Sequence, residues 1–176
     1  MSRIQSFNAV SRPDARLLIL GSVPGVASLV QQQYYAHPRN AFWPIMAELL
    51  GFDADLPYST RLQRLQYHRI ALWDVVHRCQ RPGSLDQNIA KDSVEANDFA
   101  TFFGQHSQLR GICFNGEAAE TLFKRHVIRG GISMPSGIKL ARLPSTSPAN
   151  AGLRPAQKLE QWRRVINDLR ATSDAR

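Results

Sequence analysis

The sequence predicts an α/β protein, a three-layer α/β/α domain with a short, mainly parallel, four-stranded central sheet. Three observations predict it. Short apolar runs alternate with helix-like patterns, each apolar run is followed by a polar or Gly/Pro turn, and no repeat or low-complexity segment interrupts the 176 residues. A chain of this length buries roughly two thirds of its unfolded surface in one core. We therefore expect a single domain over residues 1–176, with its motifs within about residues 15–170.

The four strands are predicted by short apolar runs at residues 17–20, 70–76, 111–114 and 138–143. In an open parallel sheet, ligands bind outside the carboxyl ends of the strands. Functional side chains are therefore expected directly after these runs. The segments concerned are residues 21–25, Asp74, residues 115–116 and residues 144–150.

Helices are predicted between the strands, because apolar side chains recur three or four residues apart. Such patterns cover residues 42–50, 99–103, 117–127 and 159–169. Pro44 is acceptable in the first turn of the first helix, and Gly51 is a plausible stop. Asn97 is expected to cap the short second helix.

Composition points to a protein that binds a polyanion. The formal net charge is +8 and the isoelectric point is about 10.2, so a basic face would gain affinity from counterion release along nucleic acid. No apolar run approaches the ~18 residues of a membrane span, and residues 1–16 lack the apolar core of a secretory signal, which predicts a cytoplasmic protein. Cys79 and Cys113 have no metal-ligand spacing, so we expect reduced thiols, no metal and no cofactor.

The segment after the first strand reads Gly21-Ser22-Val23-Pro24-Gly25. Its glycines let backbone N–H groups point at an anion or at the edge of a base. It lacks the lysine of a Walker loop and the G-x-G-x-x-G spacing of a dinucleotide fingerprint. Taken alone, it is also compatible with an ordinary turn between a strand and a loop.

Residues 34–43 crowd aromatic side chains, an amide, a histidine and an arginine into ten positions. Such a group suits a flipped base, which needs a stacking surface and hydrogen bonds to its edge. For Tyr35 and Asn40 this interpretation is as good as the structural one, in which Asn40 caps the next helix. Phe42 and Trp43 are better explained as core residues, and His37 as a partner of local backbone.

Five motifs in order support a family resemblance. They are Gly-Ser-Val-Pro-Gly at residue 21, Tyr-Ala-His-Pro-Arg-Asn-Ala-Phe-Trp at residue 35, Leu-Trp-Asp-Val-Val at residue 72, Phe-Asn-Gly at residue 114 and Leu-Pro-Ser-Thr-Ser-Pro-Ala-Asn at residue 143. Together they resemble the uracil-DNA glycosylase superfamily, most of all its hypoxanthine-DNA (deoxyinosine) glycosylase branch. The mismatch-specific uracil/thymine branch is the next most similar. The resemblance implies a monofunctional enzyme that extrudes a deaminated base, preferably hypoxanthine, from duplex DNA and hydrolyses its N-glycosidic bond.

The resemblance also implies roles for individual residues. Asn40, Asn115 and Ser22 would be catalytic. The base would be bound by Tyr35, Gly21, Val23, Pro24, Asp74 and Phe42, with Tyr35 stacking on its plane. The loop that pinches DNA phosphates would contain Ser145, Thr146, Ser147, Pro148, Ala149 and Asn150, with Pro148 and Ala149 as a wedge in the minor groove.

Two positions depart from the family pattern. Related branches orient the attacking water with an Asn or Asp in the first motif, where this chain has Val23. Because valine has no lone pairs, we expect this task to fall to Asn40, to Ser22 or to backbone carbonyls. Asp74 stands where the main uracil branch has a base-reading Asn, and an ionised carboxylate there would accept a hydrogen bond and donate none.

The other basic residues lie outside the five motifs. The lysines, Lys91, Lys124, Lys139 and Lys158, lie outside the motif loops, so no Schiff-base lyase activity is expected. Candidate phosphate contacts are Arg61, Arg64, His68, Arg69, Arg78 and Arg81, each of which is better explained singly as a solvated surface charge. Three alternatives stay open: a mismatch-specific uracil/thymine glycosylase, a catalytically silent DNA-binding module on the same fold, and an α/β hydrolase of a small phosphorylated metabolite.

Overall fold

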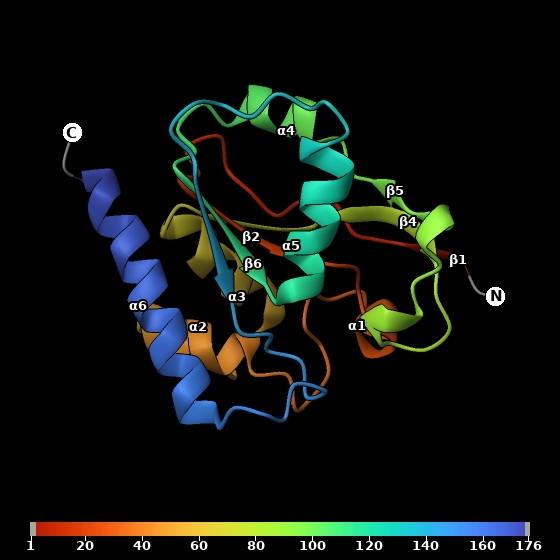
Figure 1. Cartoon of the computed structure of the whole chain (residues 1–176). Coiled ribbons are helices and arrows are strands. Elements are labelled where there is room, and N and C mark those ends of the chain that lie inside the picture. The colour runs from red at the N-terminus through yellow and green to blue at the C-terminus, as the bar shows by residue number, and fades with distance from the viewer. Residues whose placement is uncertain (1–2, 175–176) are drawn as a thin grey trace.

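The computed structural model describes residues 3–174 and has a parallel four-stranded sheet at its centre (Figure 1). The strand order is β3-β2-β6-β7. The strands are β2 (Leu17–Gly21), β3 (Ile70–Asp74), β6 (Gly111–Asn115) and β7 (Lys139–Leu143). The predicted fold class is therefore confirmed, and the predicted strand ends lie within two residues of the observed ones.

Helices cover both faces of this sheet. The α2, α3 and α6 helices (Phe42–Leu50, Tyr58–Tyr67 and Pro155–Asp174) pack on one face. The other face carries α4 (Phe99–Gln105) and α5 (Glu117–Phe123), which continues as the π-turn η3 (Lys124–Ile128). In β2, Leu17 and Ile19 belong to the first core, whereas Leu18 and Leu20 belong to the second, because successive strand side chains alternate between faces. Burial on both faces explains why β2 reads as one continuous apolar run.

A second, antiparallel sheet was not predicted. Its order is β1-β4-β5, from β1 (Arg3–Gln5), β4 (Val76–Gln80) and β5 (Glu95–Ala96). The run at residues 70–76 was expected to be one strand, but β3 ends at Asp74 and the chain passes directly into β4. The backbone N–H groups of Val75 and Val76 donate to the carbonyls of Gly21 and Ser22, at 2.9 and 3.0 Å. The chain thereby crosses the end of β2 and delivers the segment after β4 to the first loop.

Two further differences concern helices. Asp98, and not Asn97, caps α4, because its Oδ1 accepts from the backbone N–H of Thr101 at 3.0 Å. Asn97 instead donates from Nδ2 to the carbonyl of Asp74 at 2.7 Å, which fixes the end of β3.

The short α1 (Val26–Gln31) and α3 were not predicted, nor were the 3₁₀ turns η1 (Asp86–Asn88) and η2 (Lys91–Ser93). Within residues 3–174, no helix has the length and apolar character needed to cross a membrane.

Candidate active site at the carboxyl ends of the strands

A cavity of about 150 Å³ opens at the carboxyl ends of the parallel strands. Five segments expected from the sequence line it: the first loop, the Tyr35–Asn40 segment, the end of β3, the end of β6, and the loop after β7. A cavity of this volume can hold a single aromatic ring. The structure therefore brings the predicted segments together in one place, on the edge of the sheet where parallel strands bind ligands.

Tyr35 lies in this cavity because its neighbour Tyr34 is fixed in the core. The Tyr34 hydroxyl donates to the carbonyl of Asn8 at 2.9 Å, and the Trp43 indole N–H donates to the carbonyl of Tyr34 at 2.9 Å. The next residue, Tyr35, has a φ of 54°, in the left-handed region that side chains rarely adopt. Its backbone is thus strained at a position that faces the cavity, a pattern that concentrates at functional sites.

One face of the Tyr35 ring is already occupied by Phe42. The two rings stack with centroids 4.1 Å apart and an interplanar angle of 27°. Phe42 is fully buried and does not line the cavity, which corrects the expectation that it contacts a base directly. Its contribution is to support the ring of Tyr35, which itself lines the cavity.

Asn40 is not the cap of α2, whose N-cap residue is Ala41, but its side chain contacts the backbone directly before that helix. Its Oδ1 accepts a hydrogen bond from the backbone N–H of Phe42 at 2.9 Å, next to the start of α2. The same side chain lines the cavity, and within residues 3–174 its Nδ2 donates to no other group. Since Oδ1 is held by the backbone, the orientation of the amide is fixed and a donor remains for a ligand. His37 behaves as expected, because its Nδ1 accepts from the backbone N–H of Arg39.

Asp74 forms the floor of the cavity and is only 3% exposed. Among the described residues, its Oδ2 has no hydrogen-bond partner. A Cβ at Gly21 would lie 2.5 Å from Asp74 Oδ1 and 3.0 Å from the Tyr35 hydroxyl, so only glycine fits there. Burial and the negative charge of Asp86 raise the pKa of Asp74 to about 7, and Arg81 opposes the shift. Near neutral pH, a large fraction of Asp74 is therefore protonated and can donate, in contrast to the ionised acceptor expected from the sequence.

Asn115 and Thr146 form a reciprocal pair at the end of β6. Asn115 Nδ2 donates to Thr146 Oγ1, and the backbone N–H of Thr146 donates to Asn115 Oδ1, both at 2.9 Å. The carbonyl of Thr146 in turn accepts from the backbone N–H of Ala41 at 3.0 Å. Asn115 lines the cavity, but these bonds make it a positioning residue that holds the loop after β7 against the Asn40 segment.

The loop after β7 divides into buried and accessible residues. Thr146 is 1% exposed, so it cannot reach a DNA backbone as expected from the sequence. Ser145, Ser147 and Pro148 line the cavity beside it. Ala149 is exposed outside the cavity, and Asn150 is tied back by its Nδ2, which donates to the carbonyl of Ser145.

The sequence of this chain also matches a known protein family. The sequence profile of the uracil DNA glycosylase superfamily covers residues 8–170. The chain belongs to this superfamily. A hypoxanthine DNA glycosylase from Methanosarcina acetivorans is 37% identical over 147 residues, which are 83% of this chain and 87% of that protein. A second, from Methanosarcina barkeri, is 38% identical over 114 residues, 64% of this chain and 71% of the relative.

The fold of the superfamily is confirmed by a solved structure. A solution NMR structure from Methanosarcina acetivorans, described as a candidate uracil DNA glycosylase, superposes with a TM-score of 0.78 and 34% identity. The match covers 96% of this chain and 99% of that one. The resemblance stated from the five motifs is therefore confirmed.

In this chain, the side chain of Val23 has a packing role. Val23 is 7% exposed and packs in a third core cluster, with Ile4, Val76, Cys79 and Ile89. Although Val23 belongs to the cavity wall, its side chain brings no polar atom to it.

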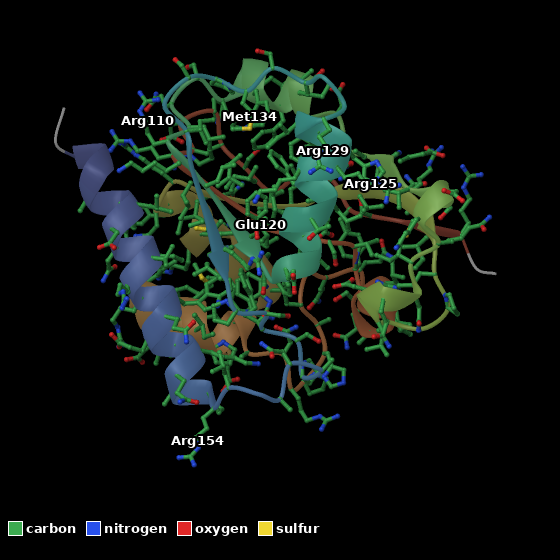
Figure 2. All side chains as sticks on the ribbon, in the orientation of Figure 1. Arg110, Glu120, Arg125, Arg129, Met134 and Arg154 are labelled. Atoms are coloured by element: carbon green, nitrogen blue, oxygen red, sulfur yellow. The ribbon has the colours of Figure 1, made fainter. Side chains whose placement is uncertain are left out.

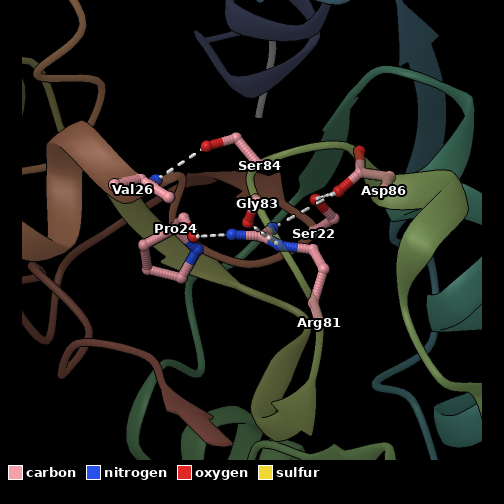
Figure 3. Close-up of polar contacts among 7 residues, drawn as sticks. All are labelled: Ser22, Pro24, Val26, Arg81, Gly83, Ser84 and Asp86. Carbon is pink, nitrogen blue, oxygen red and sulfur yellow. Dashed lines mark hydrogen bonds and ion pairs between the residues drawn. The ribbon is translucent and has the colours of Figure 1, made fainter. Parts of the chain in front are cut away.

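Sequence reasoning missed the segment after β4 as part of the site. Ser84 and Asp86 line the cavity beside the first loop, and Ser22 Oγ donates to Asp86 Oδ1 at 2.6 Å (Figure 3). Arg81, considered as a phosphate contact, is 1% exposed and cannot serve as one. The only signal was the turn-like Gly83-Ser84-Leu85-Asp86, which carries no spacing that would join it to Ser22, 64 residues away.

Proposed function

We propose that this chain is a monofunctional DNA glycosylase that removes a deaminated base, preferably hypoxanthine, from duplex DNA by hydrolysis of the N-glycosidic bond. The observation that carries the proposal is the cavity in which the ring of Tyr35, the Asn40 amide and the Asp74 carboxyl meet. A flipped base needs a stacking surface and polar groups on its edge. Both relatives described above are hypoxanthine DNA glycosylases, which supports the substrate class.

The donors in the cavity suit a deaminated base. Deamination replaces an exocyclic amino donor by a carbonyl acceptor beside a ring N–H. Protonated Asp74 offers one O–H donor and one carbonyl acceptor, which complement that carbonyl and that N–H. Asn40 Nδ2 adds a donor for the negative charge that grows on the base as the bond breaks.

The surface around the cavity mouth suits a phosphate backbone. Ser145, Ser147 and Pro148 line the cavity on the side of the loop after β7. Arg154, which directly precedes α6, lies on the same side of the molecule as the loop after β7. Arg110 lies at the opposite end (Figure 2). With a net charge of +8, these groups support duplex DNA as the partner.

A panel of duplexes, each with one deaminated base, tests the proposal. We expect conversion of deoxyinosine duplex to an abasic site whose backbone breaks only after alkali, with the same rate in EDTA. The reason is that the cavity residues are amides, hydroxyls, carboxyls and aromatic rings, with no lysine among them. Excision of uracil alone would favour the mismatch-specific alternative. Scission without alkali, or trapping of the enzyme by borohydride, would contradict the monofunctional mechanism.

Tyr35→Ala should weaken binding of an extruded base by about 1–3 kcal/mol, because one base–aromatic stack is lost. Tyr35→Phe should be nearly silent, since the Tyr35 hydroxyl is buried without a hydrogen-bond partner among the described residues. Affinity for duplex with an uncleavable deoxyinosine analogue measures the effect, and the melting temperature serves as control. A parallel loss of thermal stability and affinity in the Ala variant would instead indicate that Tyr35 acts only in packing against Phe42.

A further inference from the structure

The attacking water needs a hydrogen-bond acceptor, and the side chain of Val23 in the first loop supplies none and packs in the core. The structure brings a carboxylate to this loop from a different part of the chain. We propose that Asp86 binds the attacking water and accepts its proton, with Ser22 as its partner. This inference rests on the proposed glycosylase function and extends it to a residue outside the five motifs.

The position of Asp86 is fixed by the first loop. Ser22 Oγ donates to Asp86 Oδ1 at 2.6 Å, which leaves Oδ2 to accept from a water (Figure 3). Two residues earlier, Ser84 Oγ accepts from the backbone N–H of Val26 at 2.9 Å. The segment carrying Asp86 is thus attached at both ends of the first loop, and its carboxylate cannot move independently of Ser22.

Arg81 is the positioning residue that joins the two segments. Its guanidinium is fully buried, its Nε donates to the carbonyl of Gly83 at 2.9 Å, and its Nη2 donates to the carbonyl of Pro24 at 2.6 Å. Nη1 lies 4.0 Å from Asp86 Oδ1 (Figure 3). A buried arginine between two loops is expensive to desolvate, and here it aligns the turn that presents Asp86 with the loop that presents Ser22.

Two carboxyl groups therefore occupy different depths of one cavity. Asp74 is 3% exposed at the floor, whereas the Asp86 side chain is 41% exposed at the mouth. A base held against Asp74 has its sugar toward the mouth, where Asp86 and Ser22 lie. Hydrolysis requires an acidic group at the nucleobase and a proton acceptor near the sugar. Asp74 and Asp86 would have these two positions.

The charges around the two carboxyl groups favour different protonation states. Burial raises the pKa of Asp86 above its ordinary value, while Ser22 and Arg81 lower it. Asp74 is more deeply buried, and the negative charge of Asp86 raises its pKa further. On its outer side Asp86 shares a groove with Lys91, Glu117, Arg125 and His126, of which three can carry positive charge. Asp86 thus has a hydroxyl donor and a nearby cation that favour its ionised form, whereas burial and the charge of Asp86 favour the protonated form of Asp74.

The reaction step balances as follows. The water oxygen bonds to C1′ of the sugar as the bond between C1′ and the base breaks, and the base leaves with that electron pair. Asp86 takes one proton from the water, and the remaining O–H becomes the hydroxyl of the abasic sugar. The proton on Asp86 then passes through solvent to the base anion, which restores both Asp86 and a neutral base.

The experiment compares Asp86→Asn with wild type in single-turnover excision of hypoxanthine. Asparagine keeps an acceptor for Ser22 but cannot take a proton, so we expect a loss of about 10²-fold. The wild-type rate should fall on acidification as Asp86 is protonated, and this limb should vanish in the variant. Asp92→Asn is the matched control, because Asp92 is an exposed carboxylate of η2 outside the cavity and its loss changes the charge equally.

A second variant separates chemistry from folding. Formate added to Asp86→Ala should restore part of the lost rate, since a small carboxylate can occupy the space and accept the proton. Affinity for duplex with an uncleavable deoxyinosine analogue should stay within about threefold of wild type in both variants. An Asp86→Asn rate within about threefold of wild type, or Asp86→Ala insensitive to formate, would overturn the assignment of Asp86. Absence of excision by wild type on every duplex would overturn the proposed function itself.

Discussion

Replacement of Asn40 by alanine should slow single-turnover excision by about 10²–10³-fold, or ~3–4 kcal/mol of transition-state stabilisation. The reason is geometric. The Asn40 Oδ1 is held by the backbone N–H of Phe42, so its Nδ2 is left as a fixed donor in the cavity. A donor fixed in advance stabilises charge that develops on the departing base without reorganisation. Duplex binding should change little, because the charge is absent from the ground state.

Asn40→Asp is the matched control for the structural role of this side chain. A carboxylate still accepts from Phe42 N–H at the start of α2, so the fold should be kept, but the donor is gone. We expect Asn40→Asp to be folded and as slow as Asn40→Ala. If it cleaves at the wild-type rate, or if Asn40→Ala costs only ~1 kcal/mol of stability and no rate, the Asn40 side chain only supports the backbone before α2.

Activity should fall about 50-fold between about pH 7 and pH 9, because the protonated fraction of Asp74 is about one half at its pKa and about one hundredth two pH units above it. The pKa of this carboxyl is raised to about 7 by burial and by Asp86, so its neutral, donating form is present below that pH and lost above it. Single-turnover rates across the alkaline range measure the effect on deoxyinosine duplex.

Asp74→Asn tests whether this carboxyl causes the alkaline loss. Asparagine keeps a donor at every pH, so its profile should be flat where the wild type falls, and ionisation of the base itself affects both enzymes equally. The folded protein keeps the Asp74 proton up to about pH 7, but the unfolded chain loses it near pH 4, so this group destabilises the fold as pH rises between these values. The melting temperature of Asp74→Asn relative to wild type should therefore increase from about pH 5 to pH 8. Equal alkaline limbs in both proteins would assign the loss to another group.

The sequence by itself determined the central sheet and the place of the site. Strands buried on both faces are continuous apolar runs, so β2, β3 and β6 could be read directly, whereas β7 is a largely exposed edge strand with two charged residues. Because parallel strands all end at one edge, the residues that follow them had to converge, and Gly21, Asp74, Asn115 and Ser145 do line one cavity. The five motifs also led to the correct superfamily.

Only the tertiary structure decided what each side chain is free to do. Phe42 and Thr146 match the family motifs, yet both are buried, one behind Tyr35 and the other in its pair with Asn115. The protonation of Asp74 depends on burial and on the charge of Asp86, neither of which a one-dimensional pattern contains. Asp86 itself reaches Ser22 only because the unpredicted β4 turns back over the end of β2. Local patterns record which face of a strand or helix is apolar, whereas hydrogen-bond partners and desolvation depend on segments far apart in the chain that meet only after folding.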